Sequence, residues 1–209
     1  MKPESPLALN GPAGRLEGLY REAGERGEGV LILHPHPLYG GNMHNKVVFA
    51  MARALGSAGL ATLRINFRGV GLSEGDYDDG QGERDDLRCG IDFLARELPG
   101  KRLFLTGFSF GAWLAMKVGA EDDRVAAMLG VGTPAGWGDM DWLAACEKPK
   151  LFIHGRKDEY CDPVRLGEEF RRLREPKRLV WIEDADHFFM EKLGELDSEL
   201  ARNLGFLVR

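Results

Sequence analysis

From residue 29 onward, runs of consecutive apolar residues alternate with stretches in which apolar residues recur every three or four positions. Consecutive apolar residues indicate strands buried on both faces, and the longer spacing indicates amphipathic helices. The pattern predicts strands at 29–33, 60–66, 102–108, 124–130, 150–154 and 178–182, and helices at 45–58, 85–96, 163–173, 189–207 and from Gly111 onward. Strands and helices that alternate in this way form a mostly parallel sheet with helices on both faces.

The residues before this alternating region predict a β-hairpin. Segments 6–10 and 14–20 flank the turn-rich stretch Asn10-Gly-Pro-Ala-Gly14. We expect this hairpin to form an antiparallel edge, which makes the fold α/β, doubly wound, with a sheet of about eight strands. A chain of 209 residues fits one compact domain, so we expect a single domain over residues 1–209.

Composition narrows the classes of function. A net charge of −5, with both signs mixed along the chain, argues against a nucleic-acid partner. No apolar stretch is long enough to span a membrane, and residues 1–6 lack the apolar core of a secretory signal. Cys89, Cys146 and Cys161 are odd in number and too scattered for a disulfide framework or a zinc knuckle. We therefore expect a cytoplasmic protein with three reduced thiols and no membrane partner.

One short motif carries the strongest chemical signal. Gly107-Phe-Ser-Phe-Gly111 lies where a predicted strand gives way to a predicted helix. G-x-S-x-G at such a junction is typical of a nucleophile elbow, a sharp turn that lifts a serine hydroxyl above the sheet. The turn forces the serine into a sparsely populated backbone conformation, so the flanking Gly107 and Gly111 have to be small. Ser109 is the candidate nucleophile, and its alternative role is that of a structural serine at a helix start.

A serine nucleophile needs a base that takes its proton and an acid that orients the base. In a doubly wound sheet, such groups lie on loops after the carboxyl ends of strands. Two loops downstream of Ser109 offer Asp158 as the acid and His187 as the base. The order serine, acid, histidine is found in the α/β-hydrolase fold and differs from that of other serine-triad folds.

Each of these two roles has a competitor. Asp162 competes with Asp158, but its place before Pro163 suits helix capping. His154 ends a strand upstream of the acid, where packing or a local hydrogen bond is its expected role. Asp186 adjoins the histidine in sequence, and we expect its side chain to point elsewhere.

These motifs resemble the α/β-hydrolase superfamily, and within it a group of small, lidless, dienelactone-hydrolase-like bacterial hydrolases. The resemblance covers nearly the whole chain and is carried by His34-Pro-His-Pro, Gly40-Gly-Asn-Met-His-Asn-Lys46, Asn66-Phe-Arg-Gly69, Gly107-Phe-Ser-Phe-Gly111 and Asp186-His-Phe-Phe189. It implies Ser109 as nucleophile, Asp158 as orienting acid and His187 as base. Dienelactone hydrolases themselves have cysteine at the nucleophile position, so the serine here means that their substrate cannot be assumed.

The backbone amides that exist limit the choice of oxyanion hole. One donor is expected to be the N–H of Phe110, which follows the nucleophile at a helix N-terminus. The second is expected from the loop 34–38, where Pro35 and Pro37 have no N–H. His36 and Leu38 remain, and we favour His36 because it lies nearer the end of the strand.

Other kinds of site are less well supported by the pattern. His34, His36 and His44 with Asp158 suggest a metal site, but the prolines stiffen the loop and no carboxylate stands at a familiar spacing beside it. The stretch 66–75 resembles a dinucleotide-binding loop, yet its glycines do not fit G-x-G-x-x-G. Arg68 in this stretch either meets an anionic substrate or ties the loop to an acid such as Glu74, and we favour the structural role. We expect no cofactor.

The expected activity is hydrolysis of an ester or thioester of a small acyl group through an acyl-serine. The segment 131–148 is short where many relatives insert a lid, which predicts an open site. Residues expected to line an apolar acyl pocket are Leu38, Tyr39, Phe108, Trp137 and Phe188. An amide or peptide hydrolase with the same triad, and a non-catalytic binding protein with the same fold, are the alternatives. A homodimer also stays open, because an apolar helix face looks the same whether it packs internally or on a partner.

Overall fold

A computed structural model describes residues 2–135 and 140–208 of the chain. Its centre is an eight-stranded sheet of order β1-β2-β4-β3-β5-β6-β7-β8. The strands are β1 (Ser5–Gly11), β2 (Gly14–Arg21), β3 (Gly29–Leu33), β4 (Ala61–Ile65), β5 (Leu103–Phe108), β6 (Val125–Val131), β7 (Lys150–Gly155) and β8 (Lys177–Ile182). Strands β3 to β8 run parallel, and the β1–β2 hairpin adds the antiparallel edge. The predicted α/β fold is confirmed.

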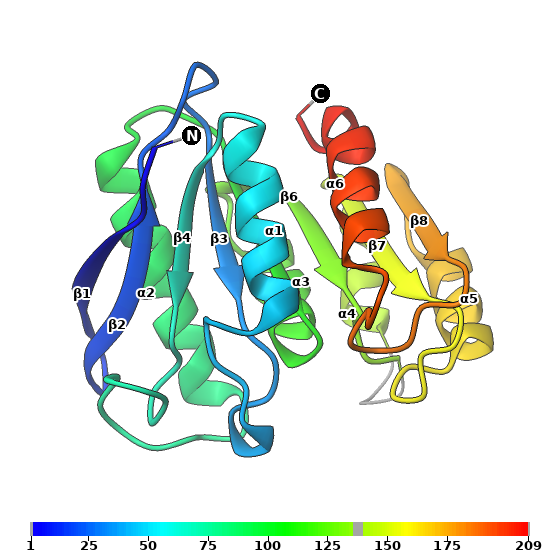
Figure 1. The fold of residues 1–209 in the computed structure, drawn as a ribbon, viewed down its shortest axis with the longest axis horizontal. Coiled ribbons are helices and arrows are strands. Elements are labelled where there is room, and N and C mark those ends of the chain that lie inside the picture. The colour runs from blue at the N-terminus through cyan, green and yellow to red at the C-terminus, as the bar shows by residue number, and fades with distance from the viewer. Residues whose placement is uncertain (1, 136–139, 209) are drawn as a thin grey trace.

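Helices cover both faces of the sheet, as Figure 1 shows. The helices are α1 (Lys46–Ser57), α2 (Gln81–Glu97), α3 (Phe110–Glu121), α4 (Asp141–Ala144), α5 (Pro163–Arg172) and α6 (Leu193–Leu207), with a 3₁₀ turn, η1, at Pro37–Tyr39. Helices α1 and α6 share one apolar core with one face of the sheet, whereas α2, α3, α4 and α5 share the other core with the opposite face. None of the described helices is long and apolar enough to cross a membrane.

Two helices begin at other residues than the apolar pattern predicts. Helix α2 begins four residues before the expected Asp85, because the Glu83 carboxylate accepts the backbone N–H of Gly80 at 2.8 Å and caps an earlier turn. Helix α6 begins at Leu193 and not at Phe189, because Phe189 and Glu191 have positive φ angles of 53° and 61°. A right-handed helix cannot pass through residues in that conformation.

The register of the sheet brings the ends of the central strands together. Leu33 of β3 pairs with Gly107 of β5, Phe108 pairs with Val131 of β6, and Val131 pairs with Ile153 of β7. The loops that follow these strands therefore meet at the carboxyl ends of the central strands, at the bottom of Figure 1. Between β6 and β7, the described residues contain only the four-residue helix α4, so in this part of the connection no lid covers the carboxyl ends of the strands.

Candidate active site

Ser109 occupies a sharp turn between β5 and α3. Its φ of 56° and ψ of −119° lie in a region that residues with a side chain rarely adopt, and its N–H donates to the Val131 carbonyl at 2.9 Å. The flanking glycines are required by space. A Cβ on Gly107 would lie 2.4 Å from the carbonyl carbon of Gly111, and one on Gly111 would lie 2.5 Å from the His34 oxygen. The structure thus has the elbow geometry that the motif predicts.

Three side chains from distant parts of the chain form one line of hydrogen bonds. His187 Nε2 lies 3.0 Å from Ser109 Oγ, and His187 Nδ1 lies 2.8 Å from Asp158 Oδ2. The other carboxylate oxygen, Asp158 Oδ1, accepts the backbone N–H groups of Tyr160 at 2.9 Å and Cys161 at 2.8 Å. A carboxylate oxygen only accepts, so Nδ1 is the donor to Asp158 and Nε2 is the ring nitrogen that can accept a hydrogen bond from the Ser109 hydroxyl.

The imidazole is held by its neighbours as well as by the carboxylate. The Phe108 ring lies 4.9 Å from the His187 ring between centroids, and Phe108 is fully buried. Gly132, with φ of 56°, presents its backbone to the same ring, because a Cβ there would lie 3.3 Å from His187 Cε1. Close packing on one side and a charge-assisted hydrogen bond on the other fix the direction of Nε2 toward Ser109.

The competing acids are engaged elsewhere. Asp162 caps α5, because its Oδ1 accepts the N–H of Val164 at 2.8 Å. Asp186 turns away from the adjacent imidazole and accepts the Met190 N–H at 2.9 Å. The structure therefore brings only Asp158, of these three carboxylates, to the histidine.

The competing histidine is also engaged elsewhere. His154 is fully buried, and its Nε2 accepts the Thr133 N–H at 3.1 Å. Burial lowers the pKa of His154 to about 3. This histidine is therefore neutral near pH 7, and its accepting nitrogen is bound within the fold.

The loop after β3 lies beside the elbow, as the oxyanion-hole prediction requires. The contact of Gly111 with the His34 carbonyl joins the two segments, and Phe110 is the first residue of α3. Within the loop, the Leu38 N–H donates to His36 Nδ1 at 3.3 Å, and His36 Nε2 lies 3.1 Å from the Tyr77 hydroxyl. The Leu38 amide is therefore used within the loop.

A cavity of about 630 Å³ opens beside Ser109 and His187. Its wall is formed largely by rings and by backbone, and the described residues that line it are Pro35, His36, Tyr39, Gly40, Gly41, Asn45, Ser109, Pro134, Tyr160, His187 and Phe188. Of the residues expected to line an acyl pocket, Tyr39 and Phe188 do so. Phe108 does not, since it supports His187 from the core, and Leu38 lies outside the lining with 67% of its surface exposed. Trp137 lies outside the described residues.

Tyr160 was not expected in this cavity. Its ring lies 4.9 Å from the His187 ring between centroids, and its backbone N–H binds Asp158. A signal for it was present in the sequence, because a residue two positions after the orienting acid shares the loop that presents the acid. Its ring direction depends on the conformation of that loop, which the apolar pattern does not contain.

The histidine loop does not have the form of a metal site. The His34 Nδ1 donates to the Pro35 carbonyl at 2.6 Å, and its Nε2 accepts the Phe67 N–H at 3.1 Å. Burial lowers the pKa of His34 to about 4, which keeps this ring neutral within the fold. Among the described residues, no three His, Cys, Asp or Glu side chains are grouped so that they could hold a metal ion.

Arg68 has the structural role expected of it, with another partner. Its guanidinium binds Asp86 of α2, with Nη2 2.8 Å from Oδ1, and its backbone N–H donates to Oδ2 at 2.9 Å. Glu74, the expected partner, instead accepts the Arg15 N–H at 2.7 Å. The expectation of Glu74 rested on nearness in sequence, whereas the fold places α2 against this loop.

Comparison with known proteins gives a consistent picture. A family model described as serine aminopeptidase, S33, matches residues 29–148. The uncharacterised protein RP471 of Rickettsia prowazekii is 36% identical over 204 residues, which cover 93% of this chain and 86% of that protein. A serine hydrolase homologue from Coxiella burnetii superimposes with a TM-score of 0.91 at 36% identity, covering 96% of this chain and 97% of that one. XC6422 from Xanthomonas campestris, a serine hydrolase without a lid, has a TM-score of 0.89 at 34% identity, covering 96% and 93%.

Proposed function

This chain belongs to the serine aminopeptidase S33 family of α/β-fold serine hydrolases, and we propose that it cleaves carboxylic esters or thioesters of small acyl groups through an acyl-serine intermediate. The observation that carries the proposal is the line of hydrogen bonds from Ser109 through His187 to Asp158. A serine hydroxyl becomes a nucleophile when a base takes its proton and an anion stabilises the resulting imidazolium.

The proposed reaction has two halves. Ser109 Oγ attacks the carbonyl carbon while its proton passes to His187 Nε2, and the Asp158 carboxylate stabilises the charged ring. The bond to the leaving group breaks as Nε2 returns the proton to the departing alcohol or thiol. Water then gives a proton to Nε2 and attacks the acyl-serine, so that the carboxylic acid leaves and Ser109 regains its hydrogen.

The negative charge that forms on the carbonyl oxygen needs donors within the site. We assign this role to the backbone N–H groups of Phe110 and His36. Phe110 stands at the N-terminus of α3, where the helix dipole favours an anion, and the His36 loop lies against the elbow. Removal of one such donor typically costs about 3 kcal/mol in the transition state.

The cavity supports a small acyl group over a long one. Its volume of about 630 Å³ is in the usual range for a small-molecule site, and its lining rings Tyr39 and Tyr160 are 85% and 63% exposed. An open, ring-lined cavity of this kind gives an extended lipid chain little surface to bury. A chain-length series with its highest kcat/KM on long acyl chains would contradict this preference.

Hydrolysis of an amide or peptide bond is the second candidate. The observation that favours it is the description of the matching family model, serine aminopeptidase. Turnover of matched p-nitrophenyl esters and amino-acid p-nitroanilides separates the two, because both release a coloured product after the same attack by serine. We expect the ester to have a kcat/KM at least about a hundredfold above that of the anilide.

A fluorophosphonate probe tests the mechanism directly. We expect one adduct, mapped by mass spectrometry to Ser109, in folded protein and none in heat-denatured protein. The Ser109→Ala variant is expected to lose about 10⁴-fold or more in kcat, since an alanine cannot form the acyl intermediate. Ser198→Ala is the matched control, because Ser198 is an exposed residue of α6 that donates to the Gly194 carbonyl.

The outcome separates an enzyme from a binding protein. Well-folded Ser109→Ala protein that keeps most of the esterase activity would overturn the mechanism. Folded wild-type protein that neither reacts with the probe nor hydrolyses an ester would favour the non-catalytic alternative.

A further inference from the structure

A second cavity adjoins the one beside Ser109 and has no part in the proposed reaction. Its volume is about 420 Å³, and its described lining residues are Gly40, Asn42, His44, Asn45, Lys46, Val47, Phe188 and Met190. Gly40, Asn45 and Phe188 line both cavities, so the two share a wall. The second cavity therefore lies next to the first, and a substrate with its carbonyl at Ser109 would enter it by extending past Phe188.

Lys46 gives this cavity its charge. Its side chain is exposed and, within the described part of the chain, has no ion-pair or hydrogen-bond partner. Other lysines are used by the fold: Lys148 Nζ lies 2.9 Å from the Gly119 carbonyl, and Lys150 Nζ lies 2.7 Å from that of Cys146. Among the described residues that line either of the two cavities, there is no carboxylate. The ammonium of Lys46 is therefore the uncompensated charge along the path from Ser109.

The remaining wall of this cavity suits a short apolar spacer. Phe188 and Met190 are 46% and 55% exposed, and they line the cavity together with Val47. A ligand that passes along them buries apolar surface in a cavity that Lys46 also lines. A cavity with an apolar wall and a cation is complementary to an apolar chain that carries an anion.

A third cavity shares part of this loop and is a poorer choice for an anion. It has a volume of about 740 Å³ and shares Gly40, Asn42 and His44 with the second cavity, but its lining includes Glu17. The Glu17 carboxylate accepts hydrogen bonds from the Asn66 side chain at 2.7 Å and the Leu72 N–H at 2.9 Å. A carboxylate in the wall makes that cavity a poorer place for an anion than the second cavity, whose described lining has Lys46 and no carboxylate.

We propose that the second cavity recognises an anionic group of the substrate, so that this hydrolase prefers esters in which an apolar spacer joins the scissile carbonyl to a carboxylate bound by Lys46. The preference rests on the proposed esterase function and specifies its substrate class. The carboxylate belongs either to the acyl part or to the leaving group of the ester, and in both cases Lys46 binds it.

Matched substrates test this preference. In the acyl arm, the p-nitrophenyl monoester of adipic acid is compared with its neutral methyl ester. In the leaving-group arm, p-carboxyphenyl butyrate is compared with p-acetylphenyl butyrate. We expect the anionic member of one pair to have a kcat/KM about threefold to tenfold higher at low salt, the range for one partly exposed ion pair, and less at about 0.5 M salt. Equal values within both pairs would overturn the proposal.

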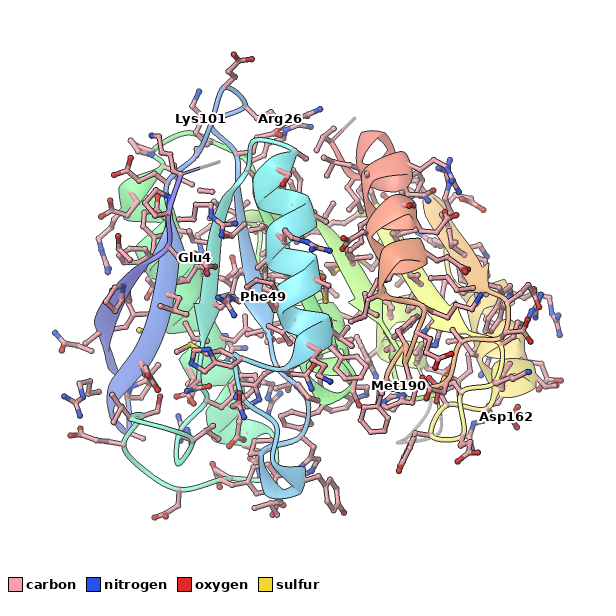
Figure 2. The ribbon with its side chains drawn as sticks, in the orientation of Figure 1. Glu4, Arg26, Phe49, Lys101, Asp162 and Met190 are labelled. Atoms are coloured by element: carbon pink, nitrogen blue, oxygen red, sulfur yellow. The ribbon has the colours of Figure 1, made fainter. Side chains whose placement is uncertain are left out.

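Charge variants identify the cation. Lys46→Met is expected to bring the anionic-to-neutral ratio to about one, and Lys46→Glu to reverse it. Lys101→Met is the control, because Lys101 lies at the opposite end of the molecule from Met190 (Figure 2) and its variant is expected to keep the wild-type ratio. A ratio that survives in Lys46→Met would assign recognition to another group and overturn the proposal.

Binding without turnover separates this proposal from the esterase function. Calorimetry on wild-type and Ser109→Ala protein measures the affinity for adipate monomethyl ester and for dimethyl adipate. Tighter binding of the anion by about threefold to tenfold, lost in Lys46→Met, would support the site even if no ester is cleaved. Equal affinity for the two ligands would overturn it even if esters are cleaved.

Discussion

Asp158 and Asp162 lie four residues apart on one loop, and their hydrogen-bond partners give them different roles. Asp158 holds two backbone N–H groups with one oxygen and the imidazole with the other. Asp162 holds the first turn of α5 and is exposed. The two carboxylates are chemically identical but differ in environment. We therefore expect substitution of Asp158 to affect the rate and substitution of Asp162 to affect the stability.

We expect Asp158→Asn to lower kcat by about 10³- to 10⁴-fold while the protein stays folded, because an amide no longer stabilises the imidazolium or selects the accepting tautomer. Asp162→Ala is expected to keep kcat and to lose about 1 kcal/mol of the free energy of unfolding, as for a lost helix cap. Ester turnover and urea titration measure the two effects. The assignment is wrong if Asp162→Ala loses turnover and Asp158→Asn does not.

At this scale the sequence was sufficient for chemistry that follows from chain order and local motif. Ser109, Asp158 and His187 could be proposed because each lies shortly after a strand of a recognisable fold. Phe108 and Tyr160 could not be placed in the same way. Phe108 is an apolar residue beside the nucleophile, and only the packing under His187 shows that it faces the core.

Among the secondary-structure elements, the start of α3 is the most tightly fitted. Backbone atoms of β3, β5 and α3 meet at Gly107 and Gly111 with no room for a Cβ. Elsewhere the apolar pattern predicted the interiors of helices and strands, since these depend on burial. It did not predict the beginnings of α2 and α6, since these depend on the Glu83 cap and on positive φ angles at Phe189 and Glu191.

Gly111→Ala is expected to destabilise the fold by about 1–3 kcal/mol, because the new methyl group would meet the Leu33 and His34 carbonyl oxygens at 2.6 and 2.5 Å. Gly167→Ala is the matched control in α5. No atom lies within 4 Å of the added methyl group there, so we expect a gain of about 0.5–1 kcal/mol from helix propensity. Chemical denaturation measures both, and an equal response of the two variants would contradict the packing argument.

Over the whole molecule, the resemblance to small, lidless bacterial α/β hydrolases is confirmed, and the sheet with its antiparallel edge agrees with prediction. The cavity could be predicted only in part, because its wall combines segments that follow β3, β5, β6, β7 and β8. Which residues of separate loops share a wall depends on register and loop conformation, and neither is contained in the periodicity of one segment. The single domain over residues 1–209 and the cytoplasmic location stay predictions.

Two buried histidines on different strand ends make stability depend on pH. Burial lowers the pKa of His34 to about 4 and that of His154 to about 3, from an ordinary value of 6.5. Between the folded pKa values of about 3 and 4 and the ordinary value of 6.5, the unfolded chain therefore binds protons more readily than the folded one. The stabilisation is fully present above about pH 6.5 and is lost as the pH falls toward 4, with up to about 1.4 kcal/mol per pH unit from each histidine.

Urea titrations from about pH 7.5 down to about pH 5 measure this slope. His154→Gln, which retains an acceptor for the Thr133 N–H, is expected to flatten it. His44→Gln, at an exposed position, is expected to leave it unchanged. A slope that does not respond to His154→Gln would show that this histidine is not the source of the acid sensitivity.

The backbone at Ser109 carries a cost that glycine would not. A residue with a side chain, held at φ of 56° and ψ of −119°, costs on the order of 1–3 kcal/mol, and glycine adopts such a conformation readily. Laboratory evolution that rewards heat resistance alone would therefore be drawn to glycine at the nucleophile position and would select inactive protein. Such a selection has to measure turnover as well as heat resistance. Ser109 is the residue proposed to do the chemistry, and its replacement by glycine would stabilise the fold.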